Sequence, residues 1–207
     1  MSKYYHLLKT HKIPPSIENP AQWLEENGFP IRGIVSCCGS PTERLSGFVD
    51  HQLQEGMKTL ESFLQDTKHT LQIIEEINDK VESGNLSLDG VAIVSLDVEN
   101  MYNNMSEELG TGATQEFLSK RLPLGGEGGD NFVSTPSLLA ALDLCLKSNY
   151  FAFDKKIYKQ VSGVGTGVKL APPYACMGLG KFEQILFDSN QELIEKIITW
   201  KRFLMMF

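Results

Sequence analysis

An acidic residue at the end of a long apolar run is the first feature of this sequence that could carry chemistry. Residues 91–98 read VAIVSLDV, and Asp97 lies near the carboxyl end of this run. A carboxylate beside a buried strand is costly unless it is hydrogen-bonded, paired or bound to a metal ion, and α/β folds place their sites at strand ends. Asp97 is therefore a candidate metal ligand, and Tyr102 could turn back over the same cleft. The alternative is that Asp97 caps the following turn and that Tyr102 only packs.

A glycine-rich segment is the second candidate. Residues 163–169 read GVGTGVK; glycines let backbone N–H groups approach a phosphate, and Lys169 adds positive charge. The segment is not a Walker loop, because Val168 separates the last glycine from the lysine. It is not a dinucleotide-binding loop either, because Pro172 and Pro173 delay the helix. The spacing leaves open another kind of phosphate loop or a plain glycine turn.

Basic residues near the amino terminus form the third candidate group. They are Lys9, Lys12, Arg32 and Arg44. Single lysines and arginines are usually solvated surface residues, so they establish no site by themselves. The four histidines have no metal-ligand spacing, and we assign them no role.

The charge balance gives a mixed indication. The formal net charge is −7 at pH 7, which argues against a general nucleic-acid-binding protein. Residues 147–182, however, carry six lysines against one acid, Asp154. This is either a solvated lysine-rich face or a basic strip that meets polyanions.

Length and composition bound the class of protein. A chain of 207 residues with 42% hydrophobic residues can form one compact domain or two modest lobes. No apolar run approaches the length of a transmembrane helix, so we expect no membrane partner. The four cysteines lack a CxxC pair and zinc spacing and indicate reduced thiols. We therefore expect an intracellular protein, nuclear or cytoplasmic; the sequence indicates no oligomeric state.

The apolar periodicity predicts a mixed α/β fold in which helices pack on a small sheet. We expect a short extended piece at 31–36, a buried strand at 91–98 and a hairpin at 149–163. Helices are predicted at 48–81 (one long helix or two in series), 105–122, 136–147, 174–183 with a continuation toward 188, and 190–198.

Five motifs occur in an order that resembles the reverse transcriptase domain of Penelope-like retroelements. They are LLKTHK at 7–12, IRGIVSCCGSPTE at 31–43, VSLDVENMYNNM at 94–105, YFAFDKKIYKQVSGVGTGVKLAPPYA at 150–175 and WKRFLMMF at 200–207. The family pattern looks like LPKIHK, RPIVS with GSPTE, SLDVxxLYTNIP, a hairpin leading into QxSGTAMGTKxAPxYA, and RxxDD. The resemblance covers nearly the whole chain and rests on the order of all five motifs.

The resemblance implies an α+β fold with the fingers and palm of a right-hand polymerase. It implies a small antiparallel palm sheet with helices packed behind it and the thumb absent. Residues 1–88 would form a fingers-like region with the long amphipathic helix, and residues 89–207 a palm-like region truncated at the second catalytic motif. The strand ending at Asp97 would lie beside a strand within 200–207.

The resemblance also implies roles for individual residues. Asp97 would be catalytic and, with the backbone carbonyl of Val98, would bind Mg²⁺ or, in its place, Mn²⁺. Tyr102 would exclude a ribose 2′-hydroxyl. The other nucleotide-binding residues would be Lys9, Lys12, Arg32, Gly167, Lys169, Ala171 and Pro172. The expected partners are an RNA template, a DNA primer and a dNTP, and the parent reaction is two-metal nucleotidyl transfer.

The chain departs from the family pattern at three places. Gly33 replaces the usual proline, and residues 164–166 read VGT in place of TAM. Met205 and Met206 stand where the family has its paired aspartates, and a thioether is a poor ligand for Mg²⁺. We therefore expect a catalytically incomplete reverse transcriptase fragment. The alternatives are a non-catalytic nucleic-acid-binding remnant and an unrelated nucleotide-binding protein.

Overall fold

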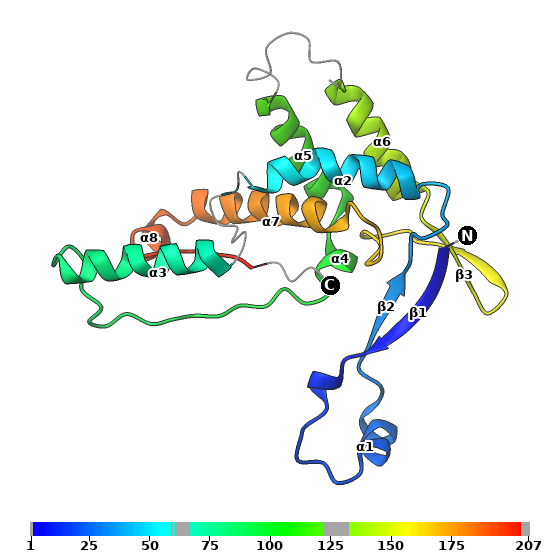
Figure 1. Cartoon of the computed structure of the whole chain (residues 1–207), viewed down its shortest axis with the longest axis horizontal. Coiled ribbons are helices and arrows are strands. Elements are labelled where there is room, and N and C mark those ends of the chain that lie inside the picture. The colour runs from blue at the N-terminus through cyan, green and yellow to red at the C-terminus, as the bar shows by residue number, and fades with distance from the viewer. Residues whose placement is uncertain (1, 59, 61–66, 122–132, 204–207) are drawn as a thin grey trace.

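The structure is a computed structural model and describes residues 2–58, 60, 67–121 and 133–203. Within these residues, a four-stranded sheet lies beside a cluster of helices (Figure 1). The mixed α/β class predicted from the sequence is therefore confirmed. None of the helices in the described ranges is long and apolar enough to cross a membrane.

The sheet combines an amino-terminal ribbon with a later hairpin. Strand β1 (Ser2–Leu8) pairs antiparallel with β2 (Ile31–Val35), and β3 (Tyr150–Phe153) pairs antiparallel with β4 (Lys156–Lys159). A parallel pairing of β1 with β3 gives the strand order β2-β1-β3-β4. The predicted extended piece around β2 and the predicted hairpin are both confirmed, whereas the sequence does not predict β1.

A two-residue turn closes the β3–β4 hairpin. Asp154 and Lys155 both have positive φ values, 46° and 60°. Turns with positive φ at both central residues match the right-handed twist of the flanking strands. The turn therefore fixes the register in which Phe151 lies opposite Tyr158.

The hydrophobic core lies among four helices. They are α2 (Glu43–Lys58), α5 (Glu107–Arg121), α6 (Thr135–Lys147) and α7 (Ala171–Asp188). Helix α7 contacts both α2 and α5, and its first two turns are almost fully buried because they consist of apolar and small residues. The largest buried side chains of this core include Val49, Leu53, Leu142, Val164, Leu170 and Tyr174.

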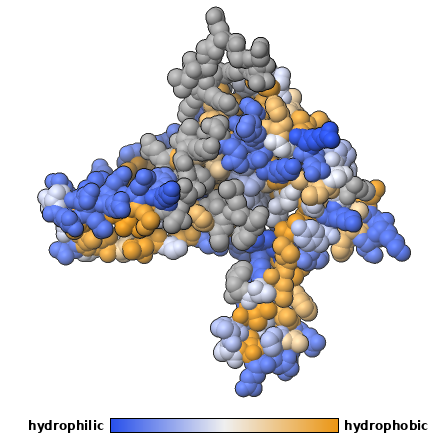
Figure 2. All heavy atoms as spheres, viewed as in Figure 1, coloured by the Kyte–Doolittle hydropathy of each residue, from blue (hydrophilic) through white to orange (hydrophobic). Residues whose placement is uncertain are grey.

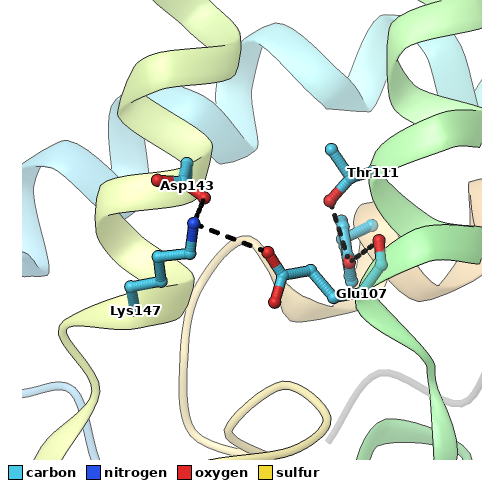
Figure 3. Close-up of polar contacts among 5 residues, drawn as sticks. Glu107, Thr111, Asp143 and Lys147 are labelled. Carbon is cyan, nitrogen blue, oxygen red and sulfur yellow. Dashed lines mark hydrogen bonds and ion pairs between the residues drawn. The ribbon is translucent and has the colours of Figure 1, made fainter.

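Helices α5 and α7 approach closely because α5 carries a glycine at their contact. A Cβ at Gly110 would collide with the ring of Tyr174. The Tyr174 hydroxyl lies 3.4 Å from Thr111 Oγ1 and 3.4 Å from the Glu107 carbonyl oxygen. Figure 3 shows these contacts beside Lys147 of α6, whose Nζ lies 3.8 Å from the Glu107 carboxylate. Polar contacts at one end of α5 therefore join it to both neighbouring helices.

The remaining helical elements lie outside this cluster. They are a 3-10 turn (Thr10–Lys12), α1 (Pro20–Asn27), α3 (Thr67–Glu82), α4 (Met101–Asn104) and α8 (Gln191–Ile194). The helical region predicted at 48–81 consists of α2 and α3, which is the second of the two predicted arrangements. The helices predicted within α5, α6 and α7 are confirmed, and α8 is shorter than the predicted helix at 190–198.

The buried strand predicted at 91–98 is wrong. This segment forms neither a strand nor a helix, and all its residues are exposed, Ile93 completely. An apolar run predicts burial, but a strand also needs a partner for its backbone N–H and C=O groups. None of the described strands lies beside this segment. Asp97 is therefore not at the end of a strand in the described part of the chain.

The expected antiparallel sheet with helices behind it also differs from the observed one. The observed sheet is mixed, because β1 and β3 are parallel. Helices α6 and α7 pack against α2 and α5 rather than behind the sheet, because their apolar faces meet in the helical core. Residues 200–203 form no continuous strand, and Met205 and Met206 lie outside the described residues.

Candidate functional site

The glycine loop, defined here as residues 163–170, connects β4 to α7 and begins against α4. The Val164 N–H donates a 2.8 Å hydrogen bond to the Tyr102 carbonyl. Gly163 has a φ of 68°, and a Cβ there would lie 2.5 Å from the carbonyl oxygens of Tyr102 and Asn103. Only glycine fits this backbone conformation so close to another chain segment. The start of the loop is therefore fixed to α4.

The middle of the glycine loop is joined to the end of β2. The Cys37 N–H donates a 3.2 Å hydrogen bond to the Gly167 carbonyl, and Ser36 pairs with Gly167 in an isolated parallel bridge. A Cβ at Gly167 would collide with the carbonyl oxygen of Val35. Gly167, to which the resemblance assigns nucleotide binding, therefore packs against the end of β2.

The end of the glycine loop is joined to α2. The Leu170 N–H donates to Ser46 Oγ over 3.3 Å, and Ser46 is fully buried. Lys169 is exposed, and its Cδ lies 3.4 Å from the place that a Cβ at Gly47 would take. Ser46 is not among the residues predicted from the sequence. The sequence feature that could have identified Ser46 is its place on the apolar face of α2, three residues before Val49.

Two amide side chains support the loop on another side. Asn149 Nδ2 donates to Gln160 Oε1 over 2.7 Å, and Gln160 Nε2 donates to the Ser162 carbonyl over 2.9 Å. A Cβ at Gly165 would lie 2.5 Å from Asn149 Nδ2. These two amides are further functional candidates that the sequence reasoning misses. Their signal is the position of Gln160 just before the glycines and of Asn149 just before β3, so that the two lie opposite each other at the open end of the hairpin.

Ala171 and Pro172 begin helix α7. Ala171 is completely buried, and Pro172 is half-buried. A proline is tolerated in the first turn of a helix because its missing N–H has no partner there. Ala171 therefore seats the helix against the core, and it offers no surface to a nucleotide.

Tyr102 and Arg32 lie near one another beside the loop. Burial raises the pKa of the half-buried Tyr102 hydroxyl, and the charge of Arg32 acts in the opposite direction. Arg32 is in β2, three residues before Val35, which contacts Gly167. The loop thus joins Tyr102 and Gly167 at the end of β2, and Arg32 lies on the same strand three residues before that end.

Lys9 and Lys12 lie on an arm formed by β1, β2 and α1, which extends away from the helical cluster (Figure 1). The Lys9 N–H donates to the Pro30 carbonyl over 2.7 Å. Pro30 precedes Val35 by five residues, which is about 17 Å of strand. The structure therefore does not group these two lysines with the glycine loop.

Asp97 and Val98 lie in the exposed segment that precedes α4. Met101, the first residue of α4, packs against the small buried cluster of Met57 and Cys176. Asp97 is therefore exposed, but it lies only four residues before Met101, whose side chain packs against the cluster that includes Cys176 of α7.

Arg202 reaches the same part of α7 from the carboxyl-terminal side. Its Nη2 lies 3.6 Å from Cys176 Sγ, and its Nη1 lies 3.0 Å from Glu183 Oε2. Trp200 Nε1 donates to the other Glu183 carboxylate oxygen over 2.9 Å. Burial raises the pKa of the Cys176 thiol to about 11, and Arg202 opposes this shift. The segment that follows Asp97 and the segment that contains Arg202 therefore both reach α7 at Cys176.

The described carboxylates do not fit a two-metal site. Among the described residues, no three histidine, cysteine or acidic side chains are grouped so that they could hold a metal ion. Asp97 and the Val98 carbonyl would supply only part of the oxygen ligands that Mg²⁺ requires. Positions 205 and 206 lie outside the described residues. The predicted Mg²⁺ or Mn²⁺ site is therefore incomplete in this part of the chain.

Comparisons with known proteins assign no family to this chain. No protein-family model, no curated protein and no solved structure matches it. The resemblance to Penelope-like reverse transcriptases therefore stays a prediction that rests on the motifs and their order.

Proposed function

We propose that this chain is a reverse-transcriptase-type domain that binds a deoxynucleoside triphosphate and an RNA–DNA hybrid without completing nucleotidyl transfer. In this proposal the arm, α2 and α3 correspond to fingers, and α5, α6 and α7 with the glycine loop correspond to a palm. The observation that carries the proposal is the bonding of the glycine loop both to Tyr102 and to Ser36 and Cys37.

The joining of these segments supports the proposal because they are far apart in the sequence. The family resemblance assigns Arg32, Tyr102 and Gly167 to one nucleotide site, and each lies 65 or more positions from the next along the chain. Chance similarity of separate motifs gives no reason for them to meet in the fold. The loop joins Tyr102 and Gly167 beside the strand that carries Arg32, as a shared nucleotide site requires.

The charge at the junction suits a triphosphate. Arg32 and the exposed Lys169 are both cationic, and α7 begins directly after the loop at Ala171. The amino-terminal end of a helix carries a partial positive charge that favours anions. The first backbone N–H groups of α7 offer little, because two prolines follow Ala171 and the Ala171 N–H already donates to Val168. Binding would therefore depend mainly on the two cationic side chains.

Nucleotidyl transfer needs more than this binding site. The reaction depends on cations that stabilise both the attacking and the leaving oxygen, and these cations are held by carboxylates. Asp97 is the only acid that the resemblance places in this role, and Met205 and Met206 offer thioethers, which Mg²⁺ does not prefer. We therefore expect binding without transfer.

A second candidate function is nucleic-acid binding without a nucleotide site. The observation that favours it is the exposed group of Lys155, Lys156 and Lys159 on the hairpin, where Asp154 is the one neighbouring acid. Such a group binds phosphates with little requirement for sequence. The two candidates differ in whether the chain also binds a free dNTP at the glycine loop.

Primer extension and dialysis together test the proposal. The chain is incubated with an RNA-templated DNA primer, dNTPs and Mg²⁺ or Mn²⁺, and labelled dATP binding is measured by equilibrium dialysis. We expect no extension, but dATP binding that Lys169→Ala weakens and that Lys196→Ala, a change of another exposed lysine, leaves intact. Hybrid binding without dATP binding would favour the second candidate. Extension abolished by Asp97→Ala would contradict the incomplete site.

A further inference from the structure

A row of aromatic rings crosses one face of the sheet and is not part of the glycine loop. The rings belong to β1, β3 and β4: Tyr4, His6, Phe151, Phe153 and Tyr158. Their centroids lie 4.7 to 6.5 Å from their neighbours', within the usual range for aromatic pairs. We call this set the aromatic row.

The aromatic row has an inner and an outer part. Tyr4 and Phe151 are half-buried, whereas His6, Phe153 and Tyr158 are exposed. Phe153 is 43% exposed and Tyr158 42%. Phe151 stacks on Tyr158 at an interplanar angle of 17°, so the exposure of Tyr158 comes from its other face and its edge. The outer rings are therefore open to a ligand.

A glycine on the neighbouring strand makes room for one ring of the row. A Cβ at Gly33 of β2 would collide with the Tyr4 hydroxyl, so the glycine lets the Tyr4 ring lie over the neighbouring strand. Gly33 is also one of the positions where the sequence departs from the motif it resembles. The glycine that replaces the usual proline is therefore the residue that leaves space for the Tyr4 ring.

No large protein element covers the row in the described chain. All residues of β4 are exposed, and none of the described helices packs extensively on a strand of this sheet. Figure 2 shows hydrophobic residues exposed along the neighbouring β1–β2 arm. Exposed apolar surface of this kind marks a binding site more often than chance.

The charge beside the row selects the kind of ligand. Lys155 and Lys156 are exposed at the hairpin turn, and Lys156 lies opposite Phe153 in the pairing of β3 with β4. Asp154 is the one acid of the hairpin. Cations next to aromatic faces suit a ligand that carries phosphates and flat rings along one chain, because lysines hold the phosphates while bases stack on the rings.

We propose that the aromatic row binds single-stranded nucleic acid, with bases stacked on His6, Phe153 and Tyr158 and phosphates held by the hairpin lysines. Sheets that expose aromatic side chains on neighbouring strands can stack two or three bases in this way. The recognition tolerates sequence, because every base has a stacking face. The row shares no residue with the glycine loop, so the proposal is independent of dNTP binding; it adds a stacking surface to the hairpin lysines named for the second candidate function.

Fluorescence anisotropy with a labelled oligouridylate about 15 nucleotides long tests the proposal. We expect Phe153→Leu/Tyr158→Leu, which keeps apolar bulk but removes the rings, to raise the dissociation constant about five- to a hundredfold. Tyr5→Ala is the matched control, because Tyr5 is 46% exposed and lies on the opposite face of β1. It should change the dissociation constant less than about twofold. Far-ultraviolet circular dichroism checks that both variants remain folded.

Two results would overturn the proposal. One is oligouridylate binding by the leucine variant as tight as that of the unmodified chain. The other is a leucine variant that still binds oligouridylate but no longer binds phosphatidylserine vesicles. That result would make the row a membrane contact. Binding of dATP at the glycine loop should be unchanged in the leucine variant, so failure of this inference is distinct from failure of the proposed function.

Discussion

The guanidinium of Arg202 lies 3.6 Å from the sulfur of Cys176 in α7. Met101, four residues after Asp97, packs against the cluster that contains the same cysteine. One turn of α7 therefore anchors both the carboxyl-terminal segment and the segment that follows Asp97. In the proposed palm, these two segments carry the two metal-binding motifs.

Removing Arg202 should destabilise the fold. Its ion pair with Glu183 is nearly buried, since the two side chains are 11% and 12% exposed. Loss of Arg202 removes the cation that balances the nearly buried Glu183 carboxylate, although the Trp200 hydrogen bond stays, and this costs about 3 kcal/mol. We expect Arg202→Ala to lower the free energy of unfolding by about this amount in urea titrations.

The exposed ion pair of Lys147 is the matched control. Lys147 Nζ lies 2.6 Å from Asp143 Oδ1, but the side chains are 58% and 48% exposed (Figure 3). Exposed pairs contribute about 0–1 kcal/mol, so Lys147→Ala should change the free energy of unfolding little. An equal loss in both variants would show that Arg202 does not anchor the carboxyl-terminal segment as described.

A methyl group at Gly167 should disturb the glycine loop. Because its Cβ would collide with the Val35 carbonyl, Gly167→Ala should lower the free energy of unfolding by about 1–3 kcal/mol and weaken dATP binding. Gly112→Ala is the control, because nothing lies within 4 Å of a Cβ there. Within helix α5, that change should leave stability unchanged or raise it by up to about 1 kcal/mol. Equal stability of the two variants would contradict the close contact between the loop and β2.

Alkaline pH should destabilise the protein through its buried thiols. Burial raises the pKa of Cys145 and of Cys176 from 9.0 to about 11. Between about pH 9 and 11, the unfolded chain therefore binds fewer protons than the folded chain, and the free energy of unfolding falls as the pH rises. Urea midpoints from pH 8 to 10 should fall less steeply in Cys145→Ser/Cys176→Ser than in the unmodified chain. The same slope in both would show that these thiols titrate normally.

Tyr102 should discriminate between deoxyribose and ribose if it lies under the sugar. We expect the chain to bind dATP about tenfold or more tightly than ATP, since a shaped pocket rejects an added hydroxyl by up to about a hundredfold. Tyr102→Ala should bring the ratio close to one in competition dialysis. Tyr5→Ala, a change of an exposed tyrosine outside both the loop and the aromatic row, should keep it. A ratio that Tyr102→Ala leaves unchanged would remove the role given to this ring.

Much of the fold could be predicted because its signals are local. Thr135 as cap followed by Pro136 predicts the start of helix α6; the helix does begin there, but its cap is Ser134, whose Oγ accepts a 3.3 Å hydrogen bond from the Ser137 N–H. The β3–β4 hairpin follows from alternation around a short turn. Each signal lies within a few residues of the element that it specifies, so one sequence suffices to read it.

The rest of the fold depends on contacts between distant segments. The parallel pairing of β1 with β3 joins Ser2 to Phe151, and no local pattern encodes that partner. The apolar run at 91–98 predicts burial, but the exposed segment has no described strand to pair with. Burial cannot be inferred from apolarity alone when the covering element is not specified nearby.

The candidate site was also predicted only in part. Motif order identified Tyr102 and Gly167, which the loop joins, and Arg32 on the adjoining strand β2. It also identified Lys9 and Lys12, which lie on the arm away from the loop. The residues that fix the loop are not chemically conspicuous. They are Ser46, Asn149 and Gln160, and their importance comes from backbone groups that they reach in space.

Restoring the missing carboxylates tests the central claim most directly. If the segments after Asp97 and after Arg202 converge as in a palm, Met205→Asp/Met206→Asp should bind Mn²⁺ at least about tenfold more tightly than Met205→Asn/Met206→Asn, because anionic oxygens dominate binding of such cations. Electron paramagnetic resonance of free Mn²⁺ measures this affinity. The account predicts that adding Asp97→Ala to the aspartate variant cancels most of the gain. No gain in affinity, or a gain that persists without Asp97, would contradict the palm assignment.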